Sequence, residues 1–131
     1  MQAFLVDLEN RPGALADVAE VIAAKGINVN GVTGATCGNG GRAAITTEDE
    51  TATRAALDDA GVTYTTMDVT EVPLAHRPGS LAAATRRLAE AGINVEAIMP
   101  TGMSGNDVTV GFVTNDPTKA REALAAVGSA R

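Results

Sequence analysis

Aromatic side chains and cysteine are scarce in this sequence. Its 131 residues include one Tyr, two Phe and no Trp, and Cys37 is the only cysteine. The hydrophobic core must therefore consist of Val, Ile, Leu and many Ala, which leaves little material for a large aromatic-lined cofactor cavity. A single cysteine excludes an intrachain disulfide and a zinc site built from thiolates. Since His76 is the only histidine, we expect no metal and no cofactor.

A basic surface and a long apolar run are also lacking. The formal net charge is −6, and the ten Lys and Arg residues form no basic stripe, so nucleic-acid binding is disfavoured. No apolar run approaches the length of a membrane helix, and the N-terminus lacks the pattern of a signal peptide. We expect a cytoplasmic protein that binds neither nucleic acid nor membrane.

The chain contains an internal duplication. The segment Arg11–Leu15 (RPGAL) recurs as Arg77–Leu81 (RPGSL), and Gly26–Val29 (GINV) recurs as Gly92–Val95, both at a spacing of 66 residues. Self-similarity at a fixed spacing indicates copies of one structural unit. We therefore predict two domains, residues 1–67 and residues 68–131.

Each copy alternates β-rich stretches with stretches of helical periodicity. In the first helix Leu15, Val18 and Ile22 are expected to form the buried stripe, and Gly26 is a suitable stop. The first copy has expected strands at 4–8, 28–36, 42–47 and 62–67, with a glycine-rich hairpin tip at 38–41. The second copy has expected elements at 69–74, 80–90, 94–100, 108–114 and 118–127.

The order β-α-β-β-α-β predicts an α+β, ferredoxin-like fold that is duplicated along the chain, with antiparallel sheets covered by helices on one face. Too few residues follow the stretch 118–127 to form a last strand, so we expect the second copy to lack it. The strand at 69–74 would then be an open sheet edge, whose backbone groups another chain can pair. We therefore expect a homodimer.

Two motifs carry a family resemblance. An N/D-R-P-G-x-L turn that opens a helix, followed by A-x-x-G-I-N-V at the end of that helix, resembles the ACT domain family. The motifs span Asn10 to Leu15 with Ala23 to Val29, and His76 to Leu81 with Ala89 to Val95. The resemblance implies a regulatory module of the stand-alone tandem kind. It also implies a free amino acid as ligand, bound at an interface between repeats or between subunits.

The physical chemistry of the turn supports the same role. A helix N-terminus offers unpaired N–H groups and a partial positive charge to a carboxylate, and glycine lets a ligand approach closely. Asn10 could accept from the ammonium group, and we expect Asn28 or Asn30 to reach the same end of the sheet. The candidate ligand-binding residues are Asn10, Arg11, Pro12, Gly13, Ala14, Leu15, Asn28, Asn30, His76, Arg77, Gly79, Ser80, Leu81 and Asn94.

These residues also have structural interpretations, which the sequence leaves open. Pro-Gly is common where a chain turns into a helix. Asn28 and Asn94 suit the bend after a helix stop, because Asn bonds locally. Arg11 and Arg77 would then simply face solvent.

The copies differ at two candidate positions. His76 replaces Asn10, and it is either an exposed loop residue or a donor whose charge changes near neutral pH. Glu96 replaces Asn30 and would repel a bound acid. We therefore expect the first copy to bind the ligand better.

Signals of catalysis are weak. The glycines at 34–41 precede a strand, so they lack the context of a phosphate-binding loop. The acidic run 48–50 suits a helix start, and Cys37 has no histidine partner in its motif. We expect no catalytic residue and no enzyme activity. The sequence favours an allosteric amino-acid sensor with a metabolic enzyme as partner. The alternative is a protein-interaction module that docks on an enzyme or transporter without a small ligand.

Overall fold

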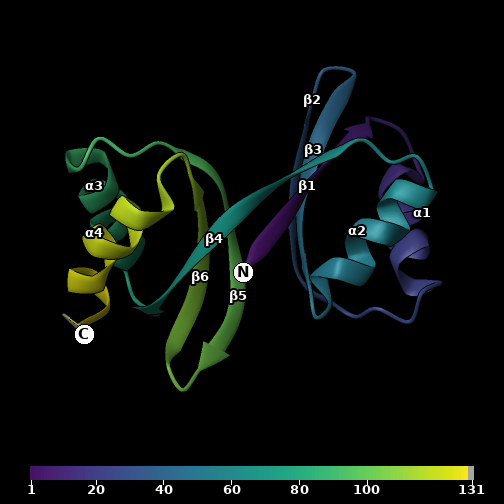
Figure 1. The fold of residues 1–131 in the computed structure, drawn as a ribbon. Helices are drawn as coiled ribbons and strands as arrows, with labels where there is room; N and C mark the ends of the chain where they lie inside the picture. Colours follow the sequence, from purple (N-terminus) through teal and green to yellow (C-terminus); the bar gives the residue numbers. More distant parts are fainter. Residues whose placement is uncertain (130–131) are drawn as a thin grey trace. The chain divides into compact units, whose positions relative to one another are not determined.

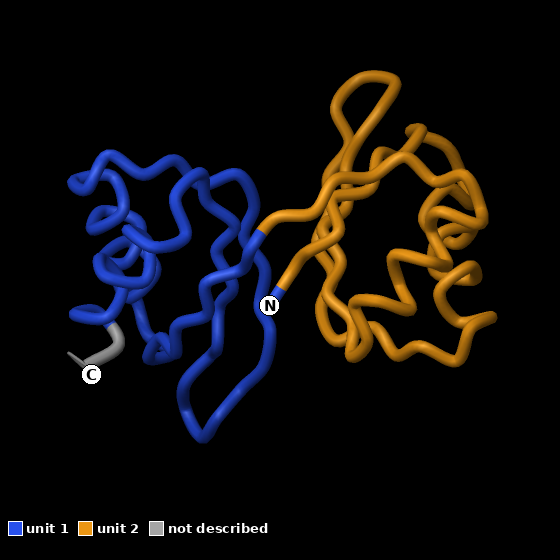
Figure 2. The backbone as a smooth tube through the Cα atoms, viewed as in Figure 1, with its two compact units in different colours: residues 1, 68–131 blue, residues 2–67 orange. Residues whose placement is uncertain are grey.

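The two copies fold with the same order of strands and helices, which confirms the predicted ferredoxin-like duplication. The computed structural model describes residues 1–129. Its elements are β1 (Gln2–Glu9), α1 (Ala14–Ala23), β2 (Val29–Cys37), β3 (Gly40–Thr47), α2 (Glu50–Asp59), β4 (Tyr64–Ala75), α3 (Ser80–Glu90), β5 (Val95–Ser104), β6 (Asp107–Thr114) and α4 (Pro117–Ser129) (Figure 1). Figure 2 shows the two units, an N-terminal unit of Gln2–Met67 and a C-terminal unit of Met1 with Asp68–Arg131.

In the N-terminal unit, β3 lies between β2 and β1 and is antiparallel to both. The Asp7 N–H donates to the Thr63 carbonyl over 3.1 Å, which brings the start of β4 to the other side of β1. Helices α1 and α2 lie on one face of this sheet (Figure 1). Phe4, Ile22 and Leu57 are fully buried in the core of this unit, together with smaller Val and Ala side chains.

The C-terminal unit repeats this arrangement. Strand β6 lies between β4 and β5 and is antiparallel to both, and α3 and α4 lie on one face of the sheet (Figure 1). The core is built around Leu88, Phe112 and Leu124. Within residues 68–129 no strand follows α4, in line with the prediction for the second copy.

Strand β4 corrects two expectations. The stretches predicted as separate strands, 62–67 and 69–74, form one strand, because only Asp68 separates them and a single non-Gly, non-Pro residue does not stop a strand. The edge beside 69–74 was expected to be open. The Val69 N–H instead donates to the Met1 carbonyl over 2.7 Å, so at Val69 the chain closes this edge itself.

In the first turns of α1 and α3, the buried residues differ from those predicted. Val18 and Ile22 are buried as predicted, but Leu15 is 47% exposed and its counterpart Leu81 is 50% exposed. In α1 the neighbouring Ala14 faces the core instead. Each Arg-Pro-Gly turn therefore keeps a large apolar side chain beside it at the surface.

A pH-dependent contact lies at the end of α2. The Tyr64 hydroxyl donates to Asp58 Oδ1 over 2.7 Å, and this bond raises the pKa of Tyr64 above its ordinary value of 10.0. Because the protonated phenol makes the bond, its contribution to stability is complete below pH 10.0 and is lost as the pH rises through the folded-state pKa.

Phenolate absorbance will report this group alone, since the chain has one Tyr and no Trp. We expect a titration midpoint above 10.0 that falls back toward that value in Asp58→Ala, because the acceptor is removed. Asp59→Ala is the matched control and should leave the midpoint unchanged. An identical midpoint in all three proteins would contradict the assignment.

Candidate functional site

The Arg-Pro-Gly turns have the same backbone geometry in both units. Gly13 and Gly79 are the N-cap residues of α1 and α3, with φ of +89° and +92°, a left-handed conformation that favours glycine. No side chain caps either helix. The first N–H of each helix donates back to the arginine carbonyl of its turn, Ala14 to Arg11 and Ser80 to Arg77, each over 3.4 Å. The next N–H groups have no capping side chain and are potential anion donors.

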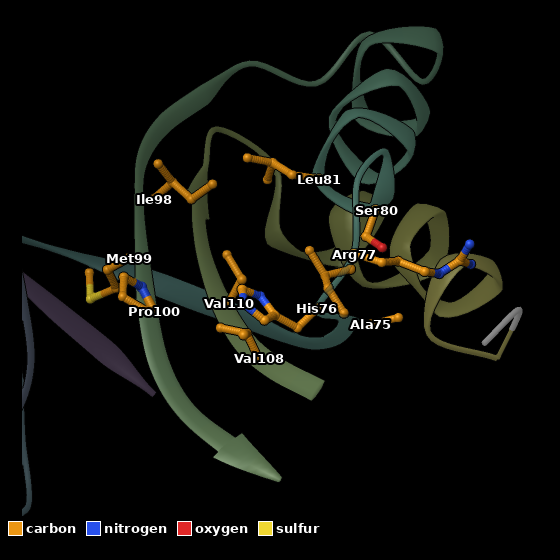
Figure 3. Close-up of a pocket in the computed structure, with 11 residues that line it drawn as sticks. Ala75, His76, Arg77, Ser80, Leu81, Ile98, Met99, Pro100, Val108 and Val110 are labelled. Carbon is orange, nitrogen blue, oxygen red and sulfur yellow. The ribbon is translucent and has the colours of Figure 1, made fainter. Parts of the chain in front are cut away.

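A cavity lies beside each turn, between the start of the helix and the edge strand. We call them the N-terminal cavity, of about 480 Å³, and the C-terminal cavity, of about 380 Å³. Both volumes suit a small ligand. The N-terminal cavity is lined by Leu8, Glu9, Asn10, Arg11, Ala14, Leu15, Val32, Thr33, Gly34, Ala35, Thr36 and Ala43. The C-terminal cavity is lined by Leu74, Ala75, His76, Arg77, Ser80, Leu81, Ile98, Met99, Pro100, Val108 and Val110 (Figure 3).

The two cavities occupy equivalent places. Nine lining positions of the N-terminal cavity recur in the C-terminal cavity at a spacing of 66 residues. The corresponding pairs are Leu8 and Leu74, Glu9 and Ala75, Asn10 and His76, Arg11 and Arg77, Ala14 and Ser80, Leu15 and Leu81, Val32 and Ile98, Thr33 and Met99, and Gly34 and Pro100. The duplication therefore extends from the fold to the candidate site.

The C-terminal cavity has a mostly apolar wall. His76, Arg77 and Ser80 are the polar residues in its lining, which contains no carboxylate. In Figure 3 the His76 imidazole lies beside Val108 and Val110, whereas the Arg77 guanidinium points away from the cavity. The cavity thus combines an apolar surface with a few polar groups near the helix start, the usual composition of a small-molecule site.

Asn10 has a structural role in the N-terminal cavity. Its side-chain N–H donates to the Gly38 carbonyl over 2.9 Å, and its backbone N–H donates to the Asn39 carbonyl over 3.0 Å. Both bonds tie the turn to the tip of the β2–β3 hairpin. His76 keeps only the backbone bond, to the Asn106 carbonyl over 3.0 Å. The side-chain tether of the turn is therefore specific to the N-terminal unit.

Arg11 is already paired with carboxylates of the same chain. Its Nε and Nη2 atoms lie 2.9 Å from Glu9 Oε2 and 2.9 Å from Asp17 Oδ2, and Nη1 donates to the Pro12 carbonyl over 3.2 Å. The hydrogen bonds to Asp17 and then to Glu9 raise the pKa of Arg11. The guanidinium is thus paired within the chain, although the side chains of Glu9 and Asp17 are 78% and 63% exposed.

The expectation that Asn28 or Asn30 reaches the turn is wrong. Strand β2 begins beside Thr47, whereas the turn follows the end of β1 that pairs with Gly40. At about 3.3 Å per residue the length of β2, roughly 25 Å, separates the two ends. The Asn28 backbone N–H donates to Glu48 Oε1 over 3.1 Å, a bond that does not use the Asn28 side chain.

The same geometry holds in the C-terminal unit. The Asn94 N–H donates to Asn115 Oδ1 over 3.1 Å, and the Asn94 side chain donates to Glu96 Oε1 over 3.0 Å. Glu96 therefore lies at the far end of the sheet from the turn. Its charge gives no reason to prefer the first copy, contrary to the sequence-based argument.

Sequence reasoning did not identify the edge-strand residues of either cavity. Val32 and Ile98 face the turns from β2 and β5 and are 49% and 36% exposed. A signal was present, because two large apolar residues recur at the same position of both copies. Pro12 and Gly13 do not line the N-terminal cavity, and their role is to set the direction of the turn.

Three further features of residues 1–129 concern metal binding, membrane crossing and thiol exposure. Within residues 1–129, no group of His, Cys, Asp and Glu side chains is arranged to hold a metal ion. None of the helices in that part of the chain combines the length and apolar content needed to cross a membrane. Cys37 is an exposed thiol at the end of β2, next to the cavity residue Thr36.

Comparison with known proteins covers both units. The family model described as an ACT domain pair matches residues 1–127, and no curated protein matches. A solved structure from Bacteroides thetaiotaomicron is 25% identical, with a TM-score of 0.79 over 95% of this chain and 86% of that chain. The ligand-free regulatory subunit of aspartate kinase from Thermus thermophilus is 24% identical, with a TM-score of 0.69 over 98% and 90%. The Thermus flavus regulatory subunit is 23% identical, with the same TM-score and coverage.

Proposed function

The chain belongs to the ACT domain pair family, and on this premise we propose that it is a regulatory sensor that binds a free amino acid and catalyses no reaction. The observation that carries the proposal is the C-terminal cavity, where an apolar wall lies beside the uncapped first turn of α3. A bound amino acid would direct its carboxylate to the helix N-terminus and its side chain to the apolar wall. Solved structures of this fold include enzyme regulatory subunits, which agrees with a regulatory role.

The proposal is tested by thermal unfolding in the presence of each of the twenty amino acids. A ligand that binds only the folded state raises stability, by about 2.7 kcal/mol at a concentration of 100 Kd. We expect a rise in Tm with one or a few amino acids of apolar side chain, because the C-terminal cavity has no acidic partner for a cationic side chain.

Equivalent substitutions in the two copies provide the control. Leu81→Glu places a carboxylate beside the C-terminal cavity and should abolish the Tm shift, whereas Leu15→Glu at the equivalent, similarly exposed position should retain it. Absence of a shift with all twenty amino acids at millimolar concentration would remove the proposal. An equal loss of the Tm shift in both variants would contradict the assignment of the ligand to the C-terminal cavity.

We also propose that the ligand is enclosed by a second copy of the chain, as in a homodimer. Leu15 with Val32, and Leu81 with Ile98, form a partly exposed apolar pair at each cavity. Covering these pairs would bury apolar surface and shield the ligand from water. Sedimentation velocity at micromolar concentration distinguishes a dimer from a monomer that stays single when the ligand is added.

A second candidate function is docking on a metabolic enzyme without a small ligand. Met103 is 69% exposed on the edge strand β5, which also carries the partly exposed Ile98, and exposed apolar side chains suit a protein partner. A complex that forms in dialysed extract and ignores added amino acids would favour this alternative over the sensor.

A further inference from the structure

On the other side of each Arg-Pro-Gly turn lies a second pocket that contains the arginine. In the N-terminal unit this pocket measures about 530 Å³, and its lining includes Arg11, Glu9 and Asp17. The Arg11 guanidinium there binds one oxygen of each carboxylate at 2.9 Å. In this turn, carboxylates therefore bind to the arginine guanidinium beside the start of the helix.

The C-terminal unit keeps the arginine and lacks both carboxylates. Its second pocket, of about 300 Å³, includes Arg77, Ala75 and Ala83 in its lining. At the 66-residue spacing Ala75 stands where Glu9 stands, and Ala83 stands where Asp17 stands. The pocket that corresponds to a filled carboxylate site in one unit therefore contains an unneutralised guanidinium in the other.

The surroundings of Arg77 favour a negative ligand. The lining of this pocket contains no acidic residue, and among residues 1–129 no ion pair involves Arg77. Residues 1–67 include nine acidic and four basic residues, whereas residues 68–131 include seven and six. Since the C-terminal unit carries little net charge, it repels an anion far less than the N-terminal unit does.

We propose that Arg77 forms a binding site for a small carboxylate in the C-terminal unit, and that Glu9 and Asp17 occupy the corresponding site of the N-terminal unit. The planar guanidinium can donate two parallel N–H bonds to one carboxylate, and the uncapped N–H groups that follow Gly79 add to the positive field. This site is independent of the proposed function, because the Arg77 guanidinium points away from the C-terminal cavity (Figure 3). The two copies then have different roles. In the N-terminal unit the arginine binds carboxylates of its own chain, and in the C-terminal unit it binds a ligand.

The test exchanges the charged groups between the copies and uses acetate as the probe. In the wild-type protein, acetate should shift the NMR signal of the Arg77 Nε–H, whereas acetamide, and sodium chloride at equal ionic strength, should not. Ala75→Glu with Ala83→Asp should weaken acetate binding at Arg77 at least about tenfold, because the new carboxylates compete for the guanidinium. Glu9→Ala with Asp17→Ala should create acetate-dependent shifts at Arg11.

Acetate shifts that persist in the Ala75→Glu/Ala83→Asp protein, or shifts that never involve Arg77, would overturn the inference. New acetate-dependent shifts at Arg11 in the Glu9→Ala/Asp17→Ala protein could not result from a loss of folding. The outcomes also separate the two proposals. Acetate binding at Arg77 without any amino-acid ligand would contradict the sensor and retain the carboxylate site. An amino acid that binds while acetate leaves the Arg77 signal unshifted would contradict the carboxylate site and retain the sensor.

Discussion

Replacing Leu88 with Ala is expected to lower the free energy of unfolding by about 2–5 kcal/mol, the range for a buried Leu truncated in a packed core. Leu88 has no exposed surface and belongs to the same core as Phe112 and Leu124. The loss combines the transfer free energy of the removed methyl groups with the cost of the remaining cavity. Urea denaturation followed by circular dichroism measures it.

Leu81 provides a control of identical chemistry on the same helix. It is 50% exposed, so Leu81→Ala should change stability by no more than about 0.5 kcal/mol. Because Leu81 lines the C-terminal cavity, this variant should weaken amino-acid binding instead. Equal destabilisation by the two substitutions would mean that the helix faces have been assigned incorrectly.

Gly41→Ala is expected to destabilise the N-terminal unit by about 1–3 kcal/mol through crowding in the hairpin. A Cβ at Gly41 would lie 2.5 Å from the Ala35 carbonyl oxygen and 3.0 Å from the Thr36 Cα. Both are backbone atoms of β2, so relief requires the two strands to move apart. The free energy of unfolding in urea again provides the measurement.

Gly40 provides a control that tests whether crowding against β2 causes the loss of stability. A Cβ at Gly40 would meet the Leu8 carbonyl oxygen at 3.6 Å, an ordinary contact, and neither glycine has a positive φ. Gly40→Ala should therefore be neutral or slightly stabilising, because Ala restricts the unfolded chain. If both variants lose the same stability, crowding against β2 is not the reason.

The repeated fold could be predicted from the sequence because the residues that end its helices and form its turns act locally. Gly26 and Gly92 stop the first helix of each copy with φ of +73° in both cases, and Gly38 gives the hairpin its left-handed residue. Such positions act through backbone conformation, which depends on few neighbours. The extension of β4 was missed because Asp68, a residue with low strand propensity, suggested a break, whereas the strand continues through it.

The candidate site was predicted less completely, for two physical reasons. Periodicity places Leu15 on the helix stripe but does not reveal that Ala14 covers the core and leaves Leu15 exposed. The error for Asn28 was avoidable, because a helix returns the chain to the opposite end of the sheet, so the next strand must begin far from the turn. The pairing of Arg11 with Glu9 and Asp17 required side-chain positions that no sequence pattern provides.

The exposed thiol of Cys37 makes the two copies distinguishable in an optical experiment. A maleimide fluorophore would react at this one position, beside Thr36 in the N-terminal cavity, and the C-terminal cavity would carry no dye. Emission that responds to an added metabolite would report occupancy of the first copy. A calorimetric signal without a change in emission would indicate binding in the second copy.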